Sequence, residues 1–229
     1  MLDQIFSYRQ MCDNENMQTL QRGMNFRLNP RYSVILMSRR SNAPYSDAIL
    51  DDGITIEYEG HDEPKSDLNP DPKIVDQPKC TKYGRSTQNG LFIESIEKYK
   101  KGLAPPERIK VYEKIMSGIW SFKGFFNLRD YEVRSDGIRN VFKFILELST
   151  ASDEMTDYEV DLKHTRLIPS EIKKEVWKRD KGKCIICGSS KNLHFDHDLP
   201  FSKGGSSLTA ANIRLLCAKH NLQKSNKIE

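Results

Sequence analysis

Side chains able to bind metal ions are concentrated near the end of this 229-residue chain. Cys184 and Cys187 are separated by two residues, and Cys217 and His220, which begin 30 residues after Cys187, repeat that spacing. A short turn of this kind places two ligands on one side of an ion, so two such pairs can complete a tetrahedral zinc site. Because protein ligands would fill all four positions, we expect a structural Zn²⁺ that supplies part of the folding free energy of a small domain.

Further polar residues lie between the two ligand pairs and directly after them. Residues 193–200 (LHFDHDLP) are followed by Gly204, Gly205 and Asn212, and Asn221 and Lys224 follow the last zinc ligand. With these residues in this order, the segment 168–228 resembles the HNH endonucleases. The resemblance implies a ββα-metal fold that hydrolyses DNA phosphodiester bonds with one divalent cation.

The resemblance also implies which side chains hold that cation and activate water. Asp196 and Asn221 would be its ligands, and their oxygen donors suit Mg²⁺ or Mn²⁺. His197 would deprotonate the attacking water, a task suited to a side chain whose pKa lies near neutrality. The neighbouring His194 is interpreted as a structural or DNA-facing residue. A zinc deaminase is not favoured, because its P-C-x-x-C element is absent: Lys183, and not proline, precedes Cys184.

Two further roles follow from the family pattern alone. Asn212 would hold the loop that orients His197, and Lys224 would contact the phosphate or the transition state. The chain departs from the pattern at two positions: Asn221 stands where some members have His, and His220 stands where Cys is common. Both replacements keep the ligand chemistry.

Charge is distributed unevenly along the chain. Residues 164–229 contain 13 Lys and Arg against 6 Asp and Glu, a net charge of +7, whereas the preceding part has 23 against 26, a net charge of −3. A basic C-terminal part is typical of a domain that meets a polyanion such as DNA, although a merely soluble basic surface has the same composition. No apolar run approaches the roughly 20 residues of a membrane span. The first residues lack the layout of a secretory signal, which predicts a cytoplasmic protein of bacterial type.

The hydrophobic pattern predicts an α+β protein with two domains. Alternating apolar residues favour strands at 32–37, 53–58, 108–114, 124–128 and 141–148, and a helical period favours a helix over 91–100. We expect residues 1–30 to form a helical extension, residues 31–150 a strand-rich domain, residues 151–166 a polar linker, and residues 167–229 the zinc-containing domain. The last domain is predicted to open with a helix after Pro169.

Short motifs in the strand-rich part carry a second resemblance. They are residues 41–47 (SNAPYSD), 51–62 (DDGITIEYEGHD), 87–90 (TQNG) and 108–112 (RIKVY). In this order they resemble the SRA family, whose members form a curved sheet or barrel and bind DNA carrying a modified cytosine that is flipped out of the helix. A pocket for such a base needs aromatic faces and a polar partner for the Watson–Crick edge. Tyr45, Asp47, Asp52 and Tyr58 are the candidates, and ordinary loop or core positions are the alternative for each.

Together, the two resemblances predict a modification-dependent restriction endonuclease of bacterial defence, with double-stranded DNA containing modified cytosine, such as 5-methylcytosine, as its partner. One HNH unit holds one scissile phosphate, so cleavage of both strands favours a homodimer. Two alternatives stay open: an HNH endonuclease that reads unmodified DNA sequence, and a catalytically inactive zinc-containing DNA-binding protein.

Overall fold

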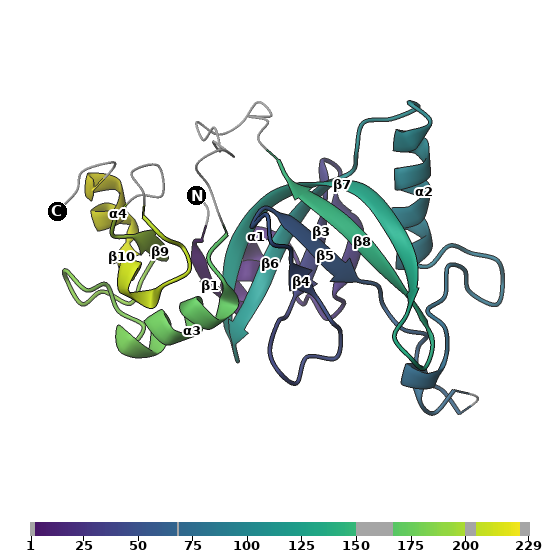
Figure 1. Ribbon diagram of the computed structural model, residues 1–229, viewed down its shortest axis with the longest axis horizontal. Coiled ribbons are helices and arrows are strands. Elements are labelled where there is room, and N and C mark those ends of the chain that lie inside the picture. Colours follow the sequence, from purple (N-terminus) through teal and green to yellow (C-terminus); the bar gives the residue numbers. More distant parts are fainter. Residues whose placement is uncertain (1–2, 68, 150–166, 200–204, 225–229) are drawn as a thin grey trace.

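The computed structural model describes residues 3–67, 69–149, 167–199 and 205–224, so the expected linker at 151–166 lies outside the described residues. Figure 1 shows a large curved sheet with the helix α2 at one end, and a smaller unit beside the other end of the sheet. The smaller unit is formed by the C-terminal residues. Within the described part of the chain, no helix is both long and apolar enough to cross a membrane.

The described residues of the larger part form an eight-stranded sheet. Its strands, in spatial order, are β2 (Met24–Asn29), β3 (Tyr32–Met37), β6 (Arg108–Met116), β7 (Ile119–Ser135), β8 (Asn140–Leu148), β5 (Thr55–Glu59) and β4 (Ala48–Ile49), and β1 (Ile5–Ser7) pairs with β7. β3 and β6 run parallel, and the other neighbours run antiparallel. All five expected strands are present. The strand expected at 124–128 is part of the much longer β7.

Helix α2 (Gln88–Lys100) covers one face of this sheet and confirms the helix expected over 91–100. Its apolar residues Phe92, Ile93 and Ile96 are fully buried in one core with strand residues such as Phe144. The helix begins where the Thr87 side chain accepts a hydrogen bond from the backbone N–H of Gly90. A Cβ atom at Gly90 would lie 2.3 Å from the carbonyl oxygen of Lys79, so only glycine fits at this start.

The first 30 residues differ from the helical extension that the sequence predicts. They contain one helix, α1 (Tyr8–Asn14), but also the strands β1 and β2. In β2 the apolar residues Met24, Phe26 and Leu28 recur at every second position, which is the period of a strand. The segment is therefore a part of the sheet and its core, and the purely helical prediction was wrong.

The smaller part contains α3 (Ser170–Arg179), β9 (Leu193–His197), β10 (Ile213–Cys217) and α4 (Ala218–Lys224). Two short 3-10 helices are also present: η1 (Pro72–Ile74) in the larger part, and η4 (Ala210–Asn212) just before β10. β9 and β10 pair antiparallel, with Asp196 opposite Arg214. The order β9, β10, α4 is the expected ββα unit, and α3 begins directly after Pro169 as expected. The α+β fold class is confirmed.

The N-terminal strand joins the two parts. β1 pairs with β7 of the large sheet through Ile5 and Ser121, while Gln4 bridges to His194 of β9. The Ile5 side chain lies in the core of the smaller part. His194 is itself buried, 3% exposed, at this junction, which is the structural position expected for it.

Buried charges lie at the same junction. The ammonium of Lys123 is 2.9 Å from the Glu113 carboxylate, and both side chains are fully buried. Lys173 of α3 binds Asp3 and lies 3.8 Å from Glu113. Burial raises the pKa of Glu113, but the positive charges of Lys123 and Lys173 lower it by more than burial raises it. The net shift is therefore downward, and the carboxylate is ionised at neutral pH. The cluster therefore holds two cations and two anions between the sheet and the smaller part.

Candidate nuclease site and base pocket

The four expected zinc ligands are assembled in one place. Cys184 and Cys187 come from the turn after α3, Cys217 ends β10, and His220 lies on the first turn of α4. Their ligand atoms all lie within 4.8 Å of one another. His220 Nδ1 is 3.4 Å from the sulfur atoms of both Cys184 and Cys217, and the sulfur atoms of Cys187 and Cys217 are 3.9 Å apart.

These distances fit a tetrahedral zinc site. With Zn–S bonds of about 2.3 Å and Zn–N bonds of about 2.0 Å, the edges of a tetrahedron measure roughly 3.5 to 3.8 Å. Burial raises the pKa of the Cys184 thiol, but backbone N–H groups of Cys217 and Cys187 outweigh it and lower the pKa to about 6. A thiol that ionises this easily is suited to bind a cation as thiolate.

Asp196 and Lys224 form the centre of the second group of residues. The Lys224 ammonium lies 2.6 Å from Asp196 Oδ2 and also donates to the backbone oxygen of His197. Arg214 Nε is 4.0 Å from the same Oδ2 atom. Both cationic groups thus approach the same carboxylate oxygen of Asp196.

His197, at the end of β9, has its ring fixed at one nitrogen. Its Nε2 atom is 2.8 Å from the hydroxyl oxygen of Ser207, a residue only 1% exposed. Burial lowers the pKa of His197 below its ordinary value, although Asp3 and Asp196 oppose the shift. The lowered pKa favours a neutral imidazole at pH 7.

The Asn212 side chain binds backbone groups of the segment between β9 and β10. Its side-chain oxygen accepts from the backbone N–H of Leu199 at 2.8 Å, and its amide nitrogen donates to the carbonyl oxygens of Leu199 and Ser206 at 3.0 Å each. A Cβ atom at Gly205 would lie 1.8 Å from the Leu199 oxygen, so glycine is required there. Ser207, whose hydroxyl contacts His197, lies in the same loop, next to Ser206.

Asn221 lies on α4, three residues before Lys224. Residues three apart lie on the same face of a helix, so Asn221 is on the face from which Lys224 reaches Asp196. It is half-buried. Its assignment as a second ligand of the catalytic cation stays a prediction.

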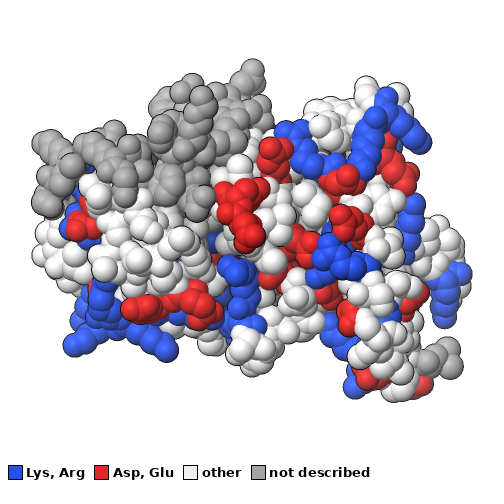
Figure 2. Space-filling view, viewed as in Figure 1, with Lys and Arg blue, Asp and Glu red and all other residues white. Residues whose placement is uncertain are grey.

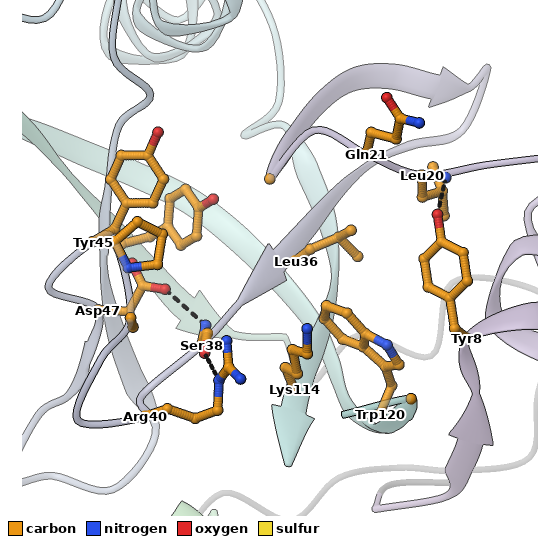
Figure 3. A pocket seen from close by; sticks show the side chains of 15 residues that line it. Tyr8, Leu20, Gln21, Leu36, Ser38, Arg40, Tyr45, Asp47, Lys114 and Trp120 are labelled. Atoms are coloured by element: carbon orange, nitrogen blue, oxygen red, sulfur yellow. Dashed lines mark hydrogen bonds between the residues drawn. The ribbon is translucent and has the colours of Figure 1, made fainter. Parts of the chain in front are cut away.

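A cavity of about 550 Å³ opens in the larger part, between strands of the sheet and the loop after β3. Figure 3 shows Tyr45, Asp47, Ser38 and Arg40 on one side of it, and Tyr8, Leu20 and Gln21 on the other. Leu36, Lys114 and Trp120 lie between the two groups. We call this cavity the base pocket; its volume is in the range of small-molecule sites.

Asp47 is the buried polar group of this pocket. Its two oxygens accept hydrogen bonds from the backbone N–H groups of Ser38 at 3.0 Å and Glu59 at 3.1 Å. Burial raises the pKa of Asp47 to about 7; the Glu59 carboxylate raises it further, while the two backbone hydrogen bonds and Lys143 act in the opposite direction. Near neutral pH the carboxyl group is thus about half protonated.

The other pocket candidates divide into two groups. Tyr45 and Tyr58 both line the base pocket, although Tyr58 is only 2% exposed and also belongs to the core. Asp52 is not among the residues that line it. The Asp52 carboxylate instead accepts from the backbone N–H groups of Ile54 at 3.0 Å and Thr55 at 2.9 Å, in the turn before β5. Asp52 therefore shapes a turn, which is the ordinary loop role that the sequence left open.

Sequence reasoning missed several residues of both sites. Ser207 was one of two adjacent serines in a polar loop, and its contact with His197 depends on the path of that loop. Tyr8 and Trp120 reach the base pocket from segments that no motif in the sequence connects.

Lys and Arg side chains gather along the lower edge of the smaller part in Figure 2, where Figure 1 places α3. Helix α3 and the turn after it carry many of the basic residues of the C-terminal part: Lys173, Lys174, Lys178, Arg179, Lys181 and Lys183. Lys173 is buried in the junction, and Arg179 pairs with Asp180 at 2.7 Å. Lys174 pairs with Glu171 at 2.6 Å. Lys178, Lys181 and Lys183 are exposed to solvent beside the ββα unit.

Comparisons with known proteins bear on both parts. Residues 184–227 match the family model of the HNH endonucleases. Among solved structures, the chain is similar to the SRA domain of SUVH5 in complex with hemimethylated CG DNA, with 19% identity and a TM-score of 0.43 over 66% of this chain and 90% of that chain.

Two other solved structures are similar to a comparable degree. For SUVH5 SRA bound to fully hydroxymethylated CG DNA the identity is 19% and the TM-score 0.42, over 64% of this chain and 87% of that chain. For Arabidopsis thaliana SUVH6 in complex with SAM the identity is 19% and the TM-score 0.42, over 76% and 28%. No curated protein matches the chain. The C-terminal part contains an HNH endonuclease domain, and the strand-rich part is similar to SRA domains.

Proposed function

We propose that this protein is a modification-dependent DNA endonuclease of restriction type, which recognises a modified cytosine with its strand-rich part and hydrolyses the DNA with its HNH domain. One observation carries the proposal. Asp196 and His197 stand side by side on β9 of a ββα unit that is closed by a Cys₃His cluster, inside the segment that matches the HNH endonucleases. The basic surface of α3 beside this unit supports DNA as the substrate.

The chemistry of the nuclease site follows from the surroundings of His197. With Nε2 donating to the Ser207 hydroxyl, the lone pair of Nδ1 accepts the proton of the attacking water. Asp196 and Asn221 would hold Mg²⁺ or Mn²⁺, and such a cation would supply positive charge against the negative charge that develops on the phosphate and the leaving oxygen. Lys224 already neutralises Asp196 in this structure, and it would move its charge toward the phosphate when DNA binds.

The zinc-type cluster has a separate role. Its four ligands join the turn after α3 to the end of β10 and the start of α4, so a bound Zn²⁺ would fix the register of the two elements that carry Asn221 and Lys224. The site leaves no open position for substrate. Its contribution would be structural.

The base pocket provides the groups that an extruded cytosine requires. The Watson–Crick edge of cytosine offers an amino donor at N4 and an acceptor at N3, and a protonated carboxyl group matches this pair with one acceptor and one donor. Asp47, with a pKa raised to about 7, can supply both. Tyr45 offers an aromatic face, and Tyr58 closes the wall of the pocket. Base flipping is the route by which a base in duplex DNA would reach Asp47.

Cleavage of both strands requires two nuclease sites, because each HNH unit holds one scissile phosphate. We propose that the active species on DNA is a homodimer. Single-strand nicking by a monomer would be the contrary result in a cleavage assay on supercoiled DNA.

The test is cleavage of matched duplexes that carry cytosine, 5-methylcytosine or 5-hydroxymethylcytosine, with Mg²⁺ or Mn²⁺ and with the His197→Ala variant as control. Cutting of modified duplexes alone, lost in the variant, is the expected result. Equal cutting of all three would reject the reading of modified cytosine and leave an HNH endonuclease that acts on unmodified DNA. Binding without cutting by the wild-type protein would point to an inactive DNA-binding protein.

A further inference from the structure

The two residues proposed to contact the base lie on a segment without regular secondary structure. Tyr45 and Asp47 follow β3 and precede β4, and residues 38–47 form neither helix nor strand. No ladder of backbone hydrogen bonds therefore holds this segment in place. Other contacts must fix the aromatic ring and the carboxyl group of the base pocket.

An ion pair holds the residue between them. Ser46 donates its backbone N–H to Glu59 Oε2 at 3.0 Å, and its carbonyl oxygen accepts from Lys143 Nζ at 2.8 Å. Lys143 Nζ also lies 3.0 Å from the same Glu59 oxygen. The carboxylate and the ammonium thus bind both backbone groups of Ser46 and bind each other as well.

Both members of this pair are buried in the sheet. Glu59 at the end of β5 and Lys143 on β8 lie directly opposite each other, and each is 6% exposed. A buried ion pair adds little net stability, because the desolvation of two charges offsets their attraction, and apolar residues of similar size often stabilise a fold as well. The pair is therefore better explained by the backbone that it holds than by the stability of the sheet.

The same two side chains act on the carboxyl group of Asp47. Burial is the largest cause of the raised pKa of Asp47; the negative charge of Glu59 raises this pKa further, and the positive charge of Lys143 lowers it. Other charged or titratable side chains share with Asp47 the lining of the base pocket or of a neighbouring cavity of about 490 Å³. They include Arg40, Tyr58, Lys73, Lys114, Asp136 and Arg139.

We propose that Glu59 and Lys143 are positioning residues of the base pocket, which hold Ser46 so that Tyr45 and Asp47 meet the modified cytosine in a fixed orientation. This role rests on the proposed reading of modified cytosine. Neither Glu59 nor Lys143 is among the residues that line the base pocket, so the pair acts through the segment that it holds. A pocket whose groups are already in place loses less conformational freedom when the base enters.

The experiment measures the affinity for a duplex with one 5-methylcytosine between about pH 6 and pH 8 by fluorescence anisotropy. The variants are Lys143→Met, Glu59→Gln, the double variant that combines them, and the conservative Lys143→Arg. Lys100→Met is the control, at an ion pair with Asp130 in which the lysine side chain is 50% exposed. The double variant does not leave one member of the buried pair charged without the other, so it avoids the cost of an unpaired ion.

For the double variant we expect a Tm close to that of wild type and about a tenfold loss of affinity for the modified duplex at pH 6. The loss arises because the carbonyl oxygen of Ser46 no longer has its charged donor. Lys143→Arg keeps a cation and a donor, and it should bind within about threefold of wild type. Lys100→Met should bind like wild type.

The single variants give a readout that a role in stability alone does not change. In the proposed pocket the neutral form of Asp47 binds the base, so the affinity falls as pH rises through its pKa. Lys143→Met removes a charge that lowers this pKa, and the fall should move to higher pH by about half a unit or more. Glu59→Gln removes a charge that raises it, and the fall should move to lower pH.

Wild-type affinity in the double variant would overturn this role, and so would single variants whose affinity falls at the same pH as that of wild type. A double variant whose Tm falls by more than about 10 °C would assign the pair to the stability of the sheet and overturn the role as well. Failure of the proposed function gives a different pattern. In that case the wild-type protein itself binds modified and unmodified duplexes equally.

Discussion

The two ring nitrogens of His197 have different surroundings, and this difference defines their roles. Nε2 contacts Ser207, and in the proposed mechanism Nδ1 would receive the proton of the attacking water. We expect His197→Ala and Asp196→Asn each to lower the rate of DNA cleavage by at least about 10³-fold, because one removes the proposed general base and the other the proposed charged ligand of the cation. Single-turnover cleavage measures the rate, and a gel-shift assay should show DNA binding within about threefold of wild type. Cleavage at the wild-type rate by either variant would show that the substituted residue is not needed for catalysis.

Ser207 is expected to act as a positioning residue. Without its hydroxyl, the His197 ring loses the bond that selects the tautomer and the orientation of Nδ1. Ser207→Ala should therefore lower kcat by about 10- to 100-fold with little change in KM, since proton transfer by a well-placed base contributes about 10²- to 10⁴-fold. Ser207→Thr keeps the hydroxyl and should recover much of the loss. Equal values for the Ala and Thr variants would show that only the packing of the loop matters.

If Asp47 binds the modified cytosine as proposed, its raised pKa makes the affinity depend on pH. Below its pKa of about 7 the carboxyl group is neutral and can donate to cytosine N3; above it, the proton is lost. Glu59 and Lys143 face the same carboxyl group, with opposite effects on its pKa. We expect affinity for the modified duplex to fall by about tenfold from pH 6 to pH 8, following the neutral fraction.

Asp47→Asn is the matched control for this prediction. Its amide has the same shape and also offers one donor and one acceptor, but it does not titrate. Its affinity should stay level between pH 6 and pH 8 in fluorescence anisotropy. A fall in affinity equal to that of the wild-type protein would assign the pH dependence to another group.

At the scale of elements, the zinc-type cluster joins three segments that are far apart in sequence. Cys217→Ser should lower the Tm by more than 10 °C or abolish the folding of the C-terminal part, because the metal supplies folding free energy in a domain of this size. Cys80→Ser, at an exposed cysteine outside the cluster, is the control and should leave the Tm unchanged. Calorimetry with and without a chelator measures both. A Cys217→Ser protein that melts like the control would exclude a structural metal.

The same elements show what the sequence could and could not predict. The four clustered ligands and the start of α3 were predicted correctly from local spacing, and the ββα unit was predicted correctly from the resemblance to the HNH endonucleases. Strand β1 was missed because its three residues have no period of their own and are defined only by partners more than 100 residues away. Asp52 and Asp47 look alike as loop carboxylates. Only the folded loop shows that Asp47 is buried in the base pocket while Asp52 caps a turn.

At the scale of the whole molecule, the buried charges of Asp3, Glu113, Lys123 and Lys173 connect the sheet to the nuclease domain. Removing one partner leaves an uncompensated buried charge, so Glu113→Ala should reduce the free energy of unfolding by about 3 to 5 kcal/mol. Glu132→Ala, at an exposed ion pair with Arg134, should cost less than about 1 kcal/mol. Urea denaturation gives both values. Similar values for the two variants would show that the junction contributes no more than a surface contact.

Strand β1 also sets a condition for recombining these domains. A nuclease domain cut from the chain at residue 167 would lose Ile5 from its core and the bond from Phe195 N–H to the Asp3 oxygen, because both partners come from the other end of the sequence. A chimera that gives this nuclease to another DNA reader must therefore carry residues 3–7 with it, or supply a strand in their place. For the same reason, a replacement of the strand-rich part alone would have to begin after β1. The nuclease domain that can be inherited or engineered as a whole therefore consists of two segments that are far apart in the sequence.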